Sequence, residues 1–260
     1  MNPQVGAAST HVHDLLTGPA QRGTARRVGR ERVAIEVAGR LIVLVPASGP
    51  QTLPCTVVVP ALEPEHADVG PTLVGGGHLV VGRREVSVVR WWEPARVRSG
   101  NAVPRPVTTG APVLDDGTRR ALHDAAAALA AGDTAVAGAR LSGVLGRGRG
   151  STPDADDAVA GLLLAARAVA PASALPRLQA VAAQVAQAAR TRTTLLSAEL
   201  LRAAAAGYAA PVLVQHLAAP TSLSAAQVER LGATSGRATL EGVTALHLAW
   251  RRTSPQEVAA

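Results

Sequence analysis

The sequence predicts an α+β protein, in which a small β-rich N-terminal barrel or sandwich precedes an Ala-rich multi-helix bundle. Composition changes near residue 110: residues 1–110 contain 20 Val and 11 Ala, whereas residues 111–260 contain 12 Val and 43 Ala. Valine favours strands because its branched Cβ stiffens the side chain, and alanine is the best helix former. Residues 98–117 carry three Pro and three Gly without apolar periodicity, which is typical of a connection. We therefore expect a β-rich domain over residues 1–110 and a helical domain over residues 111–260.

Short apolar or alternating segments predict five or six strands in the first domain. Residues 32–38 alternate, Gly39-Arg40 forms a turn, and residues 41–45 follow, which is the pattern of a hairpin. Further strands are expected at residues 56–59, 79–81 and 85–90. The pair Trp91-Trp92 is expected to cover a core edge, with ligand stacking as the alternative.

Helix-breaking and helix-capping residues divide the second domain into a series of helices. Gly132 and Gly207 favour left-handed C-caps, Asp133 and Thr152 are suitable N-caps, and Ser224 to Gln227 has capping-box spacing. The helices expected from this punctuation cover residues 118–131, 134–145, 153–170, 177–190, 195–206, 210–218, 224–232 and 235–251.

Composition argues against several classes of protein. The longest uncharged apolar run, residues 158–166, is too short to span a membrane, and residues 1–10 do not resemble a secretory signal. Cys55 is alone, which excludes an internal disulfide framework. We therefore expect a soluble cytoplasmic protein that needs no membrane and no cofactor.

The excess of positive charge does not by itself indicate nucleic-acid binding. All 26 basic residues are Arg, a bias that suggests GC-rich codon usage. Five of them cluster within residues 22–32, but no aromatic residue adjoins that cluster to stack on bases. We therefore expect no nucleic-acid partner. His11 and His13 are too short a pair to define a metal site and are expected to lie on the surface, so we expect no metal either.

The segment Gly146 to Asp157 is the most informative part of the chain. Three alternating glycines can adopt positive φ and lead directly into a helix start, whose free N–H groups and partial positive charge attract anions. Arg147 and Arg149 add guanidinium groups suited to phosphate or carboxylate. Asp154, Asp156 and Asp157 follow at once. They are either helix-start residues paired with the two arginines, or acceptors for the N–H groups of a carbamoyl or carboxamide ligand.

This segment resembles the signature of a bacterial family catalogued as a domain of unknown function, which includes the oxamate carbamoyltransferase subunit AllH of allantoin (ureide) catabolism. Thr152, Pro153, Asp156 and Asp157 match its glycine-loop pattern. Thr193, Thr194 and Ser197 resemble its downstream Thr-Thr-x-x-Ser element, and residues 232–242 resemble its closing element through Ser235 and Gly236. Arg147, Ser151, Asp154, Ala155 and Ala238 depart from the pattern.

The resemblance implies a subunit of a carbamoyltransferase that transfers a carbamoyl group between oxalurate and phosphate and needs partner chains. Positioning such a ligand calls for oriented N–H donors and a cation. The alternative is a non-catalytic accessory or ligand-sensing protein that kept the fold and lost the site, which the replacement of an acid by Ala238 favours. No catalytic residue can be assigned. The expected ligand-binding residues are Gly148, Arg149, Gly150, Thr152, Asp156, Asp157, Thr194, Ser235 and Gly236.

Overall fold

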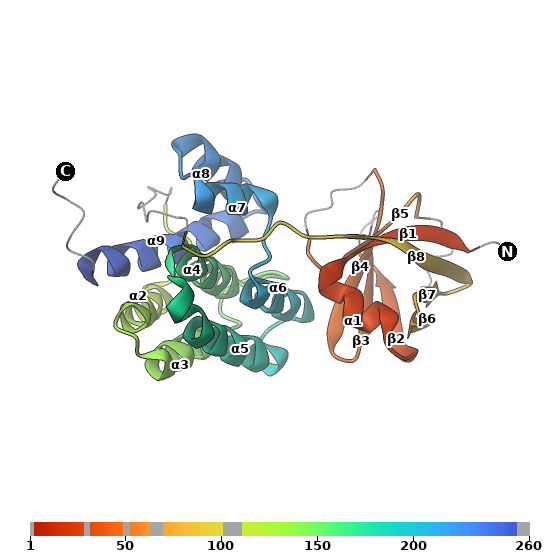
Figure 1. The fold of residues 1–260 in the computed structure, drawn as a ribbon, viewed down its shortest axis with the longest axis horizontal. Coiled ribbons are helices and arrows are strands. Elements are labelled where there is room, and N and C mark those ends of the chain that lie inside the picture. The colour runs from red at the N-terminus through yellow and green to blue at the C-terminus, as the bar shows by residue number, and fades with distance from the viewer. Residues whose placement is uncertain (1–2, 29–31, 49–52, 63–69, 101–110, 254–260) are drawn as a thin grey trace. The chain divides into compact units, whose positions relative to one another are not determined.

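The computed structural model describes residues 3–28, 32–48, 53–62, 70–100 and 111–253. The chain divides into two compact units, Met1–Pro94 and Ala95–Ala260, and each is described by itself (Figure 1). The first is built of strands and the second of helices, so the expected α+β class is confirmed. Half of the expected connection, residues 101–110, lies outside the described residues.

The first unit is a closed barrel of eight strands within the described residues. The strand order around it is β1-β5-β4-β3-β2-β6-β7-β8, in which β1 pairs with β8 and β4 with β5 in parallel and the other neighbours are antiparallel. A closed barrel leaves no edge strand unpaired. The strands are β1 (Gln4–Ser9), β2 (Gln21–Arg27), β3 (Val33–Val37), β4 (Arg40–Pro46), β5 (Thr56–Val59), β6 (Gly70–Gly75), β7 (His78–Val81) and β8 (Arg84–Trp92).

The expected hairpin is present as β3 and β4, joined by a tight turn. Ala38 and Gly39 have φ of 51° and 68°, and two successive positive φ values match the right-handed twist of the flanking strands. Ile35 pairs with Ile42, and both are fully buried in the barrel. A 3-10 turn, η1 (Thr10–Val12), and a short helix, α1 (His13–Thr17), follow β1 and bury Leu16.

The second unit contains eight α-helices within the described residues, and most of their ends follow the sequence. The helices are α2 (Asp116–Ala130), α3 (Thr134–Val144), α4 (Asp154–Val169), α5 (Leu175–Arg192), preceded by a 3-10 turn, η3 (Ala172–Ala174), then α6 (Leu195–Ala206), α7 (Pro211–Ala218), α8 (Ser222–Glu229) and α9 (Ser235–Thr253). Asp133 caps α3 by accepting from the Val136 N–H, and Gly207 closes α6 in the left-handed conformation, both as predicted.

Two predicted caps are wrong. Helix α4 starts after Pro153 without a side-chain cap, because the Thr152 hydroxyl contacts Ser235 instead. The capping box lies at Thr221 and Ser224, three residues before the predicted one, because Thr221 takes the extended conformation that an N-cap needs.

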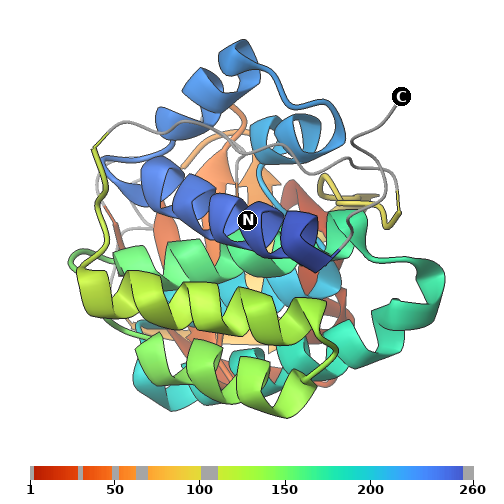
Figure 2. The same ribbon diagram turned by 90° about the vertical axis from the view of Figure 1, so that its left-hand side faces the viewer.

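Helix α4 is the centre of the helical core, and its apolar residues are buried on almost every side. It packs against α9, which also lies along α2 (Figure 2). Gly161 and Gly242 allow this close approach, because a Cβ at Gly161 would collide with the Thr239 carbonyl and one at Gly242 with the Ala158 carbonyl. The close packing brings the first turns of α4 and α9 together.

Candidate functional site

The loop between α3 and α4 exposes unbonded backbone donors. Gly146, Gly148 and Gly150 have φ of 80°, 113° and 87°, as the sequence predicts. At Gly148 glycine is also required sterically, since a Cβ would lie 2.6 Å from the Asp154 nitrogen. In the described part of the chain, no hydrogen-bond acceptor contacts the amides of residues 148–152, and Arg149 is exposed without an ionic partner. The loop therefore offers several N–H groups and one guanidinium to an anion.

Asp156 ties the loop to a second turn. Its side chain is buried, with 1% exposed, and Oδ1 accepts a hydrogen bond from the Gly146 N–H at 2.8 Å. Its Oδ2 accepts from the Ser197 hydroxyl at 2.7 Å and from the Thr193 hydroxyl. A carboxylate with three such donors is well compensated for its burial. Both oxygens of Asp156 are therefore engaged within the protein.

The Thr193-Thr194 turn at the start of α6 lies against the glycine loop. The Thr194 hydroxyl donates to the Ser151 carbonyl at 2.5 Å and accepts from the Ser197 N–H at 3.1 Å, so one side chain joins the two segments and caps the helix. The Thr194 hydroxyl thus satisfies one of the free N–H groups at the start of α6, which leaves one fewer N–H donor there for a ligand.

The turn before α9 is the third segment that meets the glycine loop and the start of α4. The Thr152 and Ser235 hydroxyls are 3.1 Å apart, and the Thr234 hydroxyl donates to Asp154 Oδ1 at 2.6 Å. Gly236 is buried and its N–H is bonded to the Leu231 carbonyl, and a Cβ there would collide with Val228. Gly236 thus serves the close packing of α8 and α9.

Asp157 is the unusual titratable group of this cluster. Its Oδ2 is buried and has no hydrogen-bond partner among the described residues. Burial raises the pKa of Asp157 to about 7; the Ser235 and Thr152 hydroxyls oppose the increase, and the charges of Asp156 and Asp154 add to it. A carboxyl group with this pKa changes charge near neutral pH and has a free acceptor atom.

The three acids are not paired with the two arginines. No ion pair joins Arg147 or Arg149 to Asp154, Asp156 or Asp157 in the described part of the chain. Arg147 instead acts on Asp115 at the N-cap of α2. The pKa of Asp115 is lowered mainly by hydrogen bonds from Thr118, with a smaller contribution from the Arg147 charge. Helix-start pairing therefore does not account for the arginines.

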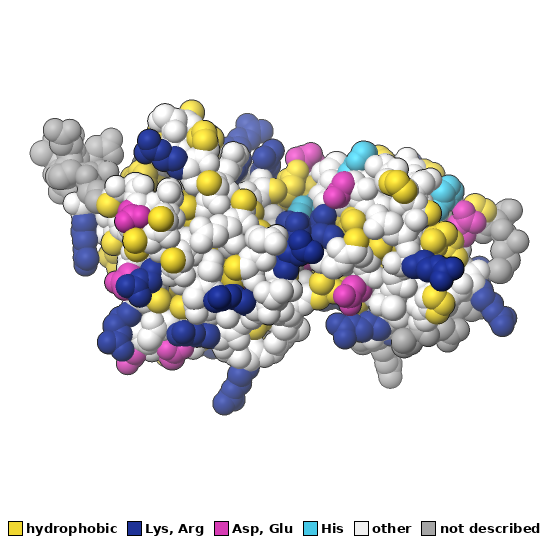
Figure 3. Space-filling model, turned by 90° about the horizontal axis from the view of Figure 1, so that it is seen from below, with side chains coloured by type: hydrophobic (Ala, Val, Ile, Leu, Met, Phe, Trp, Pro, Cys, Tyr) yellow, Lys and Arg dark blue, Asp and Glu magenta, His cyan; other side chains and the backbone are white. Residues whose placement is uncertain are grey.

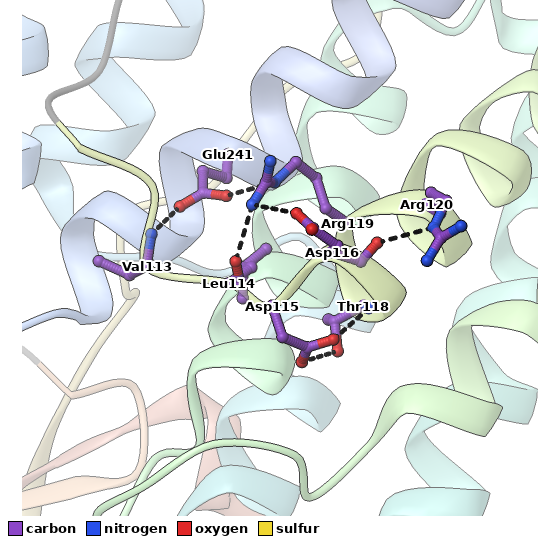
Figure 4. A network of polar contacts seen from close by, with 8 residues as sticks. All are labelled: Val113, Leu114, Asp115, Asp116, Thr118, Arg119, Arg120 and Glu241. Atoms are coloured by element: carbon purple, nitrogen blue, oxygen red, sulfur yellow. Dashed lines mark hydrogen bonds and ion pairs between the residues drawn. The ribbon is translucent and has the colours of Figure 1, made fainter.

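A separate polar network fixes the segment before α2 (Figure 4). Glu241 on α9 accepts from the Val113 N–H at 2.6 Å and lies 3.8 Å from Arg119, whose guanidinium donates to the Leu114 carbonyl and pairs with Asp116. These contacts fix the segment before α2, while Arg119 Nε and Glu241 Oε2 make no hydrogen bond among the described residues. Nothing in the sequence analysis indicated it.

Most of the sequence-predicted residues meet in one region. The hydrogen bonds bring Thr152, Asp156, Thr194 and Ser235 together, with Asp157 beside the Thr152–Ser235 pair, while Gly148, Arg149 and Gly150 form the adjoining exposed loop. Residues outside the predicted set that take part are Ser151, Asp154, Thr193, Ser197 and Thr234. The sequence motif could have indicated Thr193 and Ser197 as partners of Asp156. A buried aspartate needs hydrogen-bond donors, and these two hydroxyls belong to the same motif.

The described residues contain neither a cluster of metal ligands nor a membrane-spanning helix. No group of three or more His, Cys, Asp or Glu side chains could hold a metal ion there. None of the helices described combines the length and the apolar character needed to cross a membrane. On the face shown in Figure 3, arginine side chains are spread among acidic and apolar ones without forming a stripe.

These observations define a class of protein: a β-barrel unit followed by a helical unit, in which a glycine loop and two hydroxyl-bearing turns meet around Asp156 and Asp157. Residues 144–247 match the family model described as oxamate carbamoyltransferase subunit AllH, and the match lies wholly within the helical unit. The resemblance predicted from the three motifs is therefore confirmed over this segment. Neither the curated proteins nor the solved structures include a match to the chain.

Proposed function

We propose that the chain is a subunit of a carbamoyltransferase-like complex and that it binds a small carbamoyl or carboxamide compound bearing an anionic group. The family match supports an association with such an enzyme and with partner subunits. The observation that carries the ligand assignment is the buried, unpartnered Asp157 Oδ2 beside unbonded loop amides. Oxamate, with a carboxylate at one end and a carboxamide at the other, has both complementary groups.

The anionic end of the ligand would be held by the loop. The amides of residues 148–152 are unbonded in the described chain, and Arg149 is exposed beside them. A guanidinium can bind two oxygens of a carboxylate or phosphate at once. These donors would orient the ligand and neutralise its charge, which is what transfer to or from phosphate requires.

The amide end of the ligand would be held by Asp157. Above pH 7 its carboxyl group is mostly ionised and accepts an N–H group strongly, whereas below pH 7 it is mostly protonated. Asp156 would act indirectly, because its oxygens already hold Gly146, Thr193 and Ser197. Asp156 would thus hold the glycine loop in the conformation in which Arg149 and Asp157 bind the two ends of the ligand.

Calorimetric titration of the full chain with oxamate and with oxalate, which lacks the amide, tests this assignment. The preference for oxamate should increase by about tenfold or more between pH 5.5 and pH 8.5, because a charge-assisted hydrogen bond forms as Asp157 ionises. Asp157→Asn should remove this pH dependence. Arg149→Ala should weaken both ligands by about tenfold.

Two exposed residues provide matched controls. Asp124→Asn on α2 and Arg190→Ala on α5 make the same charge changes on other helices and should leave both affinities unchanged. A preference for oxamate that is the same at both pH values, or that persists in Asp157→Asn, would exclude Asp157 as the amide acceptor.

The second candidate function is a non-catalytic accessory or ligand-sensing protein. Ala238, where the family pattern has an acid, is completely buried in the helical core and provides no carboxylate to a ligand. Assay of carbamoyl transfer by the chain together with its partner subunits distinguishes the two functions. Turnover that needs this chain and is lost in Arg149→Ala supports the carbamoyltransferase subunit. Binding of oxamate without any effect on turnover supports the sensor.

A further inference from the structure

A second candidate site lies in the helical unit, where residues 96–98 pass the ends of α4 and α7. The cavity there has a volume of about 190 Å³. Two arginines, Arg96 and Arg98, line it together with the apolar side chains of Ala168, Val214, Leu217 and Ala218. Along α4, Ala168 is 14 residues from Asp154, or about 20 Å at 1.5 Å per residue. The cavity is thus separate from the glycine loop.

Within the described residues, no acidic side chain pairs with the arginines at this cavity. Arg96 donates from Nε to the Ala206 carbonyl at 3.0 Å, and its guanidinium carbon is 5.4 Å from the centre of the Tyr208 ring. Arg167 donates from Nε to the Val97 carbonyl at 2.9 Å. Arg98 is exposed and has neither a hydrogen bond nor an ion pair within the described residues. The terminal nitrogens that face away from these carbonyls are available to an anion.

The positive charge of the arginines near this cavity exceeds the negative partial charge of the neighbouring helix C-termini. Helices α4, α6 and α7 all end near the cavity, and each C-terminus carries roughly half a negative charge. Three arginines therefore retain a net positive charge. Burial lowers the pKa of Arg167, and the neighbouring charge of Arg96 lowers it further, as expected where cations gather without a counter-ion.

We propose that this cavity binds a short aliphatic monocarboxylate, with its carboxylate on Arg96 and Arg98 and its hydrocarbon part against Val214 and Leu217. An apolar cavity of about 150 Å³ accommodates benzene, with six non-hydrogen atoms. This cavity, at about 190 Å³, therefore has room for a ligand of about six to eight non-hydrogen atoms. An apolar lining disfavours inorganic phosphate, which would lose hydration there without compensation. The charged rim disfavours a neutral molecule of the same shape.

Calorimetric titration of the full chain with 3-methylbutanoate tests the proposal. The carboxylate should bind at least about tenfold more tightly than 3-methylbutanamide, which has the same shape without the charge. The affinity for 3-methylbutanoate should exceed that for acetate, which lacks the hydrocarbon part, by at least about tenfold, because each buried CH₂ contributes ~0.8 kcal/mol. Inorganic phosphate should bind more weakly than 3-methylbutanoate.

The matched variants are Arg98→Gln and Arg177→Gln. Arg98 is exposed, so its replacement should leave folding intact and weaken 3-methylbutanoate by about tenfold. Arg177 lines a different cavity of the helical unit and should be neutral when replaced. Equal binding of the carboxylate and the amide, tighter binding of phosphate, or an effect of Arg177→Gln as large as that of Arg98→Gln would each overturn the proposal.

Discussion

Replacing Asp157 by Asn should change how the stability of the helical unit depends on pH. The pKa of this carboxyl group is about 7 in the folded chain and 3.8 in its ordinary state. Because the folded value is the higher one, the folded chain holds the proton more tightly, and this stabilisation is present at low pH and lost as pH rises toward 7. Each pKa unit corresponds to about 1.4 kcal/mol, so the full effect is about 4 kcal/mol.

Urea unfolding at pH 5 and pH 8, followed by circular dichroism at 222 nm, measures this effect. At pH 5 the unfolded carboxyl is already mostly ionised while the folded one is protonated, so the linkage amounts to roughly 3 kcal/mol between the two pH values. From pH 5 to pH 8 the free energy of unfolding of the wild-type chain should therefore fall by roughly 3 kcal/mol relative to that of Asp157→Asn.

The comparison is insensitive to the other titrating groups, because both chains contain them. Asp124→Asn should show no pH-dependent difference from wild type, since this side chain is exposed on α2. A difference between wild type and Asp157→Asn that is independent of pH, or that has the opposite sign, would refute the argument that burial makes this carboxyl titrate near pH 7.

Four other perturbations have defined outcomes. Asp156→Ala should destabilise the helical unit by about 3–5 kcal/mol in urea unfolding, because buried donors lose their acceptor; a loss below ~1 kcal/mol would contradict its central place. Gly148→Ala should cost more than Gly132→Ala, since both have positive φ but only Gly148 also has Asp154 within 2.6 Å of the added Cβ. Burial lowers the pKa of His216, so the folded chain loses stability as pH falls below 6.5, and His216→Gln should reduce that loss in urea unfolding. The same loss of stability at low pH in His216→Gln and wild type would contradict this prediction. Limited proteolysis within residues 98–117 should release a stable C-terminal fragment of roughly 145 residues, and early cleavage inside the helices would exclude that boundary.

The sequence was most informative where local chemistry determines structure. The bounds of α6 follow from Thr194 and Gly207, a hydroxyl cap and a left-handed glycine, and both act within one helical turn. The strand β5 is a short Val run with Pro54 and Pro60 on its flanks. Likewise, the positive φ values of the glycine loop required no knowledge of the rest of the chain.

Strands that depend on distant partners could not be predicted. Strand β2, Gln21–Arg27, has a single buried apolar residue, Ala25, and is a strand because β3 and β6 pair with it on both sides. The prediction of five or six strands was too low for this reason, since barrel closure recruits segments without apolar alternation.

The candidate site was predicted as a set of residues, and their individual roles depend on contacts across the sequence. Asp156 and Asp157 are adjacent and chemically identical, yet one is saturated by Gly146, Thr193 and Ser197 while the other keeps a buried free oxygen. Successive residues of a helix point about 100° apart, and only the packing of neighbouring turns decides which carboxyl meets donors.

The most direct test of the central claim is to map oxamate binding onto the backbone by ¹H–¹⁵N NMR of the full chain. We predict that oxamate at pH 8 shifts the amide signals of residues 148–152 and that Arg149→Ala raises the oxamate concentration needed for these shifts by about tenfold. Shifts confined to other parts of the chain, or none at oxamate concentrations that saturate a millimolar site, would contradict the assignment of the glycine loop as the ligand site.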